Sequence, residues 1–119
     1  MLKAVEKVFK ALADKNRLRI LKMLQRKSMC VCEIREVLGL AQPTVSKHLK
    51  ILKDAGIIEA DQKGLWTNYS INCQNNYALA LSSLAKGWLG KDAIIQVDLY
   101  KARNVDRAKL CCPGKRRRK

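Results

Sequence analysis

Hydrophobic positions in the first half of the chain recur every three or four residues, and polar residues or glycines interrupt the pattern. This spacing places apolar side chains along one side of a helix. Ser28 is expected to cap the third such segment, and Gly39 is expected to end it in a left-handed conformation. The pattern predicts helices over 2–12, from about 17, over 29–38 and over 43–55.

The hydrophobic period changes in the second half of the chain. Residues 57–60 and 65–71 are typical of two short strands joined by 61–64, since apolar and polar residues alternate along the second segment. The helical period returns over 75–88 and continues or restarts over 95–99. The sequence therefore predicts a mainly α fold with a small β-hairpin.

A helix, a tight turn containing glycine, a second helix and a hairpin form the layout of a winged helix-turn-helix. In this module the second helix lies in the major groove of DNA, with its first residues at the base edges. Val45, Leu49 and Leu52 should point inward, which leaves the polar residues of this helix to face DNA. The hairpin tip adds a cation for the DNA backbone or the minor groove. The candidate DNA-binding residues are Gln42, Thr44, Ser46, Lys47, His48, Lys50 and Lys63.

The charge of the chain agrees with a nucleic-acid partner. The formal net charge is +15, from 25 basic and 10 acidic residues. Five of the positive charges lie in 115–119, so the rest of the chain still carries +10. A field of this sign attracts polyanions and speeds encounter with them.

Other features limit the class of protein. The chain of 119 residues suits one domain, which we expect over 1–105, followed by a flexible tail over 106–119. No apolar run is long enough to span a bilayer and no signal peptide opens the chain, so we expect a cytoplasmic protein that does not bind membranes. A single histidine, with no nucleophile elbow and no phosphate loop, argues against an enzyme.

The chain resembles the ArsR/SmtB family of metal-responsive repressors. The likeness is carried by LGLAQPTVSKHLKIL at 38–52, by DKNRLRIL at 14–21, and by Tyr69 and Ile71 after the hairpin turn. It extends from residue 4 to about residue 100. It implies a homodimer, built from the first and last helices, that binds operator DNA and releases it when an inducer arrives.

Dimerisation also fits the apolar surface of the last helical segment. A single chain would leave this surface uncovered, and large exposed apolar patches mark interaction sites. A two-fold dimer would set two recognition helices about one DNA turn apart and would predict an imperfect palindrome as the target. The residues concerned are Leu79, Leu81, Leu84, Trp88 and Leu89.

Two thiols one residue apart, Cys30 and Cys32, open the third predicted helix. Cys30 shares the apolar face of that helix, whereas Cys32 is expected to point toward Arg35 and Glu36. On a regular helix, side chains two residues apart diverge by about 200°, so one ion can bind both thiols only by distorting the first turn. Such a distortion would move the recognition helix packed on this segment and weaken operator binding.

Within the family, Cys-Val-Cys at this place resembles the site of arsenic- and antimony-responsive members, and also that of cadmium- and lead-responsive ones. Trivalent arsenic prefers three soft thiolates, and cadmium or lead prefers three or four. Arg35 stands where arsenic-responsive members often have a third cysteine, and no cysteine-bearing arm precedes the first helix. We therefore expect Cys111 or Cys112 to complete the site.

The sequence is compatible with several functions. Trivalent arsenic or antimony is the expected inducer, and cadmium, lead or zinc is the alternative within the same fold. A different class is a redox switch, in which Cys30 and Cys32 oxidise to a disulfide, or either oxidises with a tail thiol. An architectural DNA-binding protein with inert cysteines is a further reading. The family's other zinc site, made by acids and histidines on the last helix, is expected to be absent because His48 is the only histidine.

Overall fold

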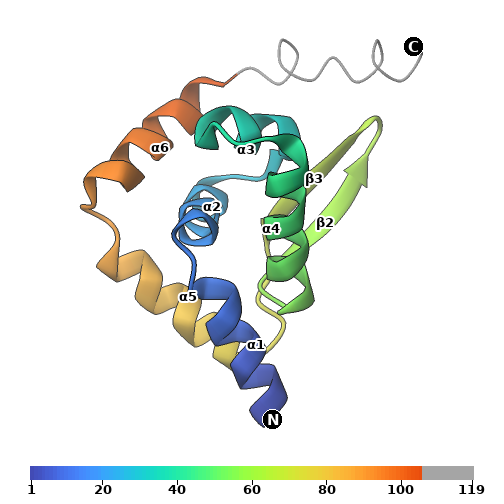
Figure 1. The fold of residues 1–119 in the computed structure, drawn as a ribbon, viewed down its shortest axis with the longest axis vertical. Coiled ribbons are helices and arrows are strands. Elements are labelled where there is room, and N and C mark those ends of the chain that lie inside the picture. The colour runs from blue at the N-terminus through green and yellow to red at the C-terminus, as the bar shows by residue number, and fades with distance from the viewer. Residues whose placement is uncertain (106–119) are drawn as a thin grey trace.

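The computed structural model describes residues 1–105, which form six helices and three strands around one core (Figure 1). Helix α2 lies at the centre, and α1, α4, α5, α6 and strand β3 all pack against it. The elements are α1 (Leu2–Leu12), α2 (Lys15–Arg26), β1 (Met29–Cys30), α3 (Val31–Leu38), α4 (Gln42–Asp54), β2 (Ile58–Lys63), β3 (Trp66–Ile71), α5 (Asn76–Trp88) and α6 (Ala93–Asn104). None of these described helices is both long enough and apolar enough to cross a bilayer.

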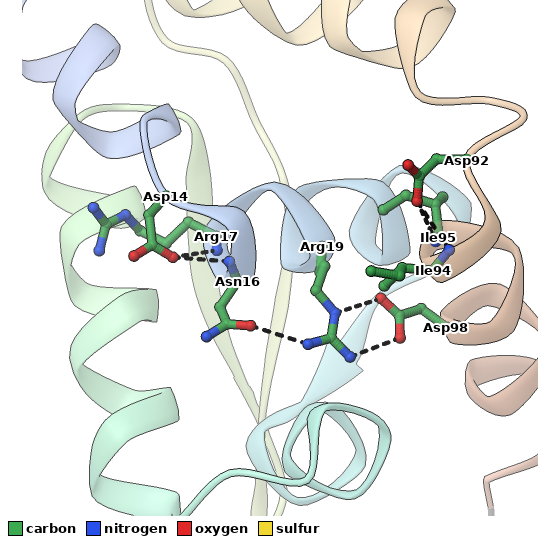
Figure 2. Close-up of polar contacts among 8 residues, drawn as sticks. All are labelled: Asp14, Asn16, Arg17, Arg19, Asp92, Ile94, Ile95 and Asp98. Carbon is green, nitrogen blue, oxygen red and sulfur yellow. Dashed lines mark hydrogen bonds and ion pairs between the residues drawn. The ribbon is translucent and has the colours of Figure 1, made fainter.

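Side-chain caps fix where three helices begin. The Asp14 carboxylate accepts hydrogen bonds from the Asn16 and Arg17 amides at 2.8 and 3.1 Å, and this starts α2 (Figure 2). Asn75 caps α5 through the Ala78 amide in the same way. Asp92 caps α6, so the apolar segment after 75–88 restarts as a separate helix rather than continuing. Each cap satisfies backbone N–H groups that the first helical turn leaves without partners.

The predicted helix-turn-helix is confirmed. Gly39 ends α3 with φ of 73°, a left-handed conformation that glycine adopts without strain. Helix α4 then begins at Gln42, with a proline in its first turn, where the missing N–H costs nothing. Val45, Leu49 and Leu52 are at most 1% exposed, as the helical spacing predicts. The turn and the apolar face together lock α4 onto α3 and the core.

The hairpin differs from the prediction in its turn. Lys63 pairs with Trp66, so the turn is two residues long rather than four and β2 extends farther than residue 60. Gly64 supplies the positive φ, 63°, that this tight turn requires. The two strands are antiparallel and form a two-stranded ribbon beside α4 (Figure 1).

A short strand, β1, joins the hairpin and was not predicted. It pairs with β3 through Met29↔Tyr69 and Cys30↔Asn68, giving the strand order β1-β3-β2. As a result α3 begins at Val31 with Cys30 as its N-cap, and the prediction of Ser28 as the cap is wrong. The chain reaches α3 from an extended conformation that the sheet imposes, and it cannot start the helix earlier.

Candidate DNA-binding surface and thiol pair

The outward face of α4 carries the polar residues that the sequence singles out. Five of the seven candidates are exposed on this helix or at its start, whereas His48 is half-buried. Lys50 donates to Asp54 Oδ2 at 3.0 Å, and both side chains are more than half exposed. Lys63 ends β2 beside the hairpin turn. The exposed residues are Gln42, Thr44, Ser46, Lys47 and Lys50.

His48 contacts Arg17 across the interface between α4 and α2. Arg17 Nη1 lies 3.0 Å from His48 Nδ1, and Arg17 Nε donates to the Ala11 carbonyl at 2.7 Å. Because a guanidinium can only donate, a hydrogen bond here requires the ring to accept on Nδ1. One arginine therefore joins the end of α1 and the start of α2 to the middle of α4. This contact is a second, internal role for a residue predicted to face DNA.

The groups at the start of α2 favour the ionised form of the Asp14 carboxyl. Burial alone would raise the pKa of Asp14, but the amide hydrogen bonds from Arg17 and Asn16 and the Arg17 guanidinium outweigh it. The pKa of this carboxyl is consequently lowered from its ordinary value of 3.8. The charged form of Asp14 is the one that the folded protein favours.

The first thiol lies at the junction of sheet and helix. The Cys30 amide donates to Glu33 Oε1 at 2.9 Å, and the two residues form a capping box at the start of α3. Glu33 is only 5% exposed, so its carboxylate is held at the helix start. The spacing is that of the common Ser-x-x-Glu box with sulfur in place of oxygen. Cys30 is thus both the last residue of β1 and the cap of α3.

The second thiol does not point outward. Cys32 is 2% exposed, as Cys30 is, so the side of α3 that it shares with Arg35 and Glu36 is covered at this position. The two cysteines form a small buried cluster with Val31 and Trp66, separate from the main core. The expectation of divergent side chains assumed that both residues belong to a regular helix, whereas Cys30 precedes the helix with φ and ψ of −89° and 169°. The backbone is thus already non-helical at the first thiol.

The ligands beyond this pair can be placed only in part. Within residues 1–105, no three histidine, cysteine or acidic side chains gather closely enough to hold a metal ion. Cys111 and Cys112 lie outside the described residues. Burial raises the pKa of the Cys73 thiol above its ordinary value of 9.0, with a hydrogen bond to Ser82 opposing the shift. Cys73 packs against the main core, away from the pair.

A buried acidic residue of the last described helix, Asp98, has a structural partner. Asp98 is buried and accepts from Arg19 Nε and Nη2 at 2.8 and 2.9 Å, a bidentate pair that joins α6 to α2 (Figure 2). Arg19 also donates to Asn16 Oδ1 at 3.0 Å. Asp98 is therefore a structural anchor of α6.

A large apolar surface lies open on α1 and α5. Phe9 is 57% exposed, Leu84 46% and Trp88 74%. Phe9 and Trp88 line a groove of about 300 Å³ whose floor includes Leu18 and Ala85. Side chains of this size rarely stay in water on a monomer, so the surface fits a protein partner.

Comparison with known proteins gives a consistent family. Residues 14–60 match the family described as "Bacterial regulatory protein, arsR family". The arsenical resistance operon repressor of Bacillus subtilis is 44% identical over 73 residues, which cover 60% of this chain and 70% of that protein. The cadmium resistance regulatory protein CadC homolog of Staphylococcus aureus is 36% identical over 69 residues, 57% of each chain.

The fold has close relatives among solved structures. One is the homodimeric winged helix-turn-helix DNA-binding domain Mb0332 of Mycobacterium bovis. It superposes with a TM-score of 0.64 at 30% identity, over 77% of this chain and 83% of that one. The match confirms the winged helix-turn-helix fold that the hydrophobic pattern predicts.

Proposed function

Because the chain belongs to the ArsR family of DNA-binding transcriptional regulators, we propose that it is a homodimeric repressor released from its operator by trivalent arsenic or antimony. The metalloid would bind the thiols of Cys30 and Cys32. The observation that carries the proposal is the buried two-thiol cluster at the start of α3. Helix α3 and a short turn connect this cluster to α4, whose outward residues are proposed to face DNA.

The chemistry of capture suits two thiols. Arsenite is As(OH)₃ at neutral pH, and each thiol replaces one hydroxyl, so two As–S bonds form and two waters leave without any change of oxidation state. The third position keeps its hydroxyl or takes a thiolate from Cys111 or Cys112. Soft sulfur ligands favour arsenic over the hard cations of the cell.

The proposed switch acts through the contact between α3 and α4. The two helices pack against each other, and packed interfaces shift between discrete arrangements rather than deforming smoothly. Bridging Cys30 and Cys32 would strain the capping box at Glu33 and displace the start of α3. Coupling energies of about 1–3 kcal/mol, or about 5–150-fold in affinity, are typical of such switches.

Dimerisation is supported by the open apolar surface and by the homodimeric relative. In the dimer, α1 and α5 of the two subunits would cover Phe9, Leu84 and Trp88. Two copies of α4 would then face successive major grooves of an imperfect palindrome.

The test compares thiol variants for inducer response. Cys30→Ser keeps the capping geometry because serine is a good N-cap, yet it removes a soft ligand. We expect Cys30→Ser and Cys32→Ser to bind operator like the wild type and to lose release by arsenite, with Cys73→Ser responding normally. The assay is a gel shift on a duplex selected from a random pool by the inducer-free protein. Normal arsenite response in both single variants would refute the site.

Cadmium or lead is the second candidate, favoured by the likeness to the cadmium resistance regulator. These ions need three or four thiolates, and within residues 1–105 only two cluster. A cadmium response should therefore vanish in the double variant Cys111→Ser/Cys112→Ser, whereas an arsenite response should persist at reduced affinity. Release of the wild type by peroxide, and by neither arsenite nor cadmium, would instead support the redox reading.

A further inference from the structure

We infer that inducer binding also acts on the wing, with Trp66 as the residue that transmits it. This inference rests on the proposed function and adds a second output to the thiol site. The site would then move both DNA-contacting parts, the recognition helix through α3 and the hairpin through β3.

The first observation is the composition of the thiol cluster. Cys30 and Cys32 are both 2% exposed, and the side chains packed against them are Val31 and Trp66. Val31 belongs to the same short segment as the thiols. Trp66 is thus the residue in the cluster that comes from a distant part of the chain. A change in the volume of the cluster can therefore reach the hairpin through this indole.

The second observation is the register of the sheet. Cys30 pairs with Asn68, and Met29 pairs with Tyr69, so the backbone carrying the first thiol is a strand of the wing sheet. Trp66 pairs with Lys63 across the tight turn. The thiol cluster therefore extends, through Trp66, to the residue pair that closes the turn at the wing tip, where a DNA contact is proposed.

The third argument concerns space. Both thiols are 2% exposed, so an arsenic atom and its third ligand would add volume to a buried cluster, and neighbouring groups would have to move when it binds. Residues 34 and 37 of the same helix are packed into the main core at 0% and 2% exposure. Every residue of β3, by contrast, is only partly buried. The wing therefore yields more readily than the body of α3, because fewer packed contacts oppose its displacement.

Two measurements distinguish arsenite binding from its effect on operator binding. Arsenite affinity of the DNA-free dimer is measured by thiolate-to-arsenic ultraviolet absorption, and operator affinity is measured by fluorescence anisotropy with and without arsenite. In Trp66→Ala we expect arsenite to bind at least as tightly as in the wild type. The weakening of operator binding by arsenite should fall to less than a third of the wild-type factor. An unchanged factor would overturn the inference.

The matched control is Thr67→Ala. Thr67 is the next residue of β3, and its hydroxyl donates to Gln62 Oε1 at 2.7 Å on the exposed side of the hairpin. This variant loosens the hairpin without touching the cluster, so it should keep the wild-type factor. An equal loss of the factor in Thr67→Ala would show that any weakened wing has this effect, and would overturn the specific role of Trp66.

Fluorescence gives an independent readout. Arsenite should change the tryptophan emission of the wild type with the midpoint of the absorption titration, and the change should be absent from Trp66→Phe. Emission that stays constant while the absorption band appears would contradict the contact. Absence of the absorption band from the wild type would instead refute the proposed function itself, so the two failures are distinguishable.

Discussion

At the residue scale, Cys30 takes part in a strand, in the capping box of a helix and in the buried thiol cluster. Its backbone is a strand residue paired with Asn68, its amide donates to Glu33, and its side chain belongs to the buried cluster against which Trp66 packs. A ligand that moves its sulfur must therefore act on a sheet and on a helix start together. This overlap makes the position suitable for a switch, since the groups proposed to bind inducer also hold the scaffold.

A residue-scale prediction concerns the cap of α2. The pKa of Asp14 is lowered, so its ionised form contributes stability that is complete above about pH 3.8 and is lost as the pH falls through the folded-state value. Asp14→Ala should cost about 1 kcal/mol at pH 7.

Asp14→Asn is the control, because asparagine caps equally well without the charge. In urea unfolding, the wild type should lose more stability than Asp14→Asn between pH 5 and pH 3. Equal losses in the two proteins would show that the carboxylate charge adds nothing.

At the element scale, the helices and the β2–β3 hairpin follow from local periodicity, whereas the third strand of the sheet does not. The caps at Asp14 and Gly39 and the inward face of α4 all depend on residues within a few positions of each other. The burial of Cys32 depends on Trp66, which only the paired hairpin brings near. A two-residue strand has no period to detect, so β1 and its effect on the start of α3 were not predicted. The Cys-x-x-Glu spacing was the one local signal of that cap.

An element-scale prediction concerns the anchor of α6. Arg19→Met would leave the Asp98 carboxylate buried without its bidentate partner, and breaking a buried pair in this way costs about 3–5 kcal/mol. The free energy of unfolding, measured in urea, should fall by that amount. The double variant Arg19→Met/Asp98→Leu removes both charges and should recover most of the loss. A single-variant cost below about 1 kcal/mol would mean that α6 is held by its apolar contacts alone.

At the scale of the whole molecule, charge and shape place the functions on different faces. Helix α4 presents its polar face beside the hairpin, while the open apolar surface lies on α1 and α5 (Figure 1). A net charge of +15 adds attraction to DNA that carries no sequence information and weakens as salt rises. In the proposed dimer, specific recognition would then come from α4 and from the spacing of the two subunits.

The dimer can be tested with a charge placed on the apolar surface. Trp88→Glu replaces a side chain that is 74% exposed, so the fold of the subunit should survive. We expect the dimer to dissociate at micromolar concentration in sedimentation velocity, with at least tenfold weaker operator binding.

Ser83→Glu adds the same charge at an exposed position of α5 away from the groove and should stay dimeric. A Trp88→Glu protein that sediments as a dimer would place the subunit contact elsewhere.

We propose that inducer capture at Cys30 and Cys32 is coupled to operator binding, so that each weakens the other by the same free energy. The most direct measurement is the equilibrium affinity of the wild-type dimer for its operator, by fluorescence anisotropy at fixed salt, with and without saturating arsenite. We expect affinity that is about 5–150-fold weaker with arsenite. Equal affinities, with arsenite shown to be bound by its thiolate absorption, would contradict it.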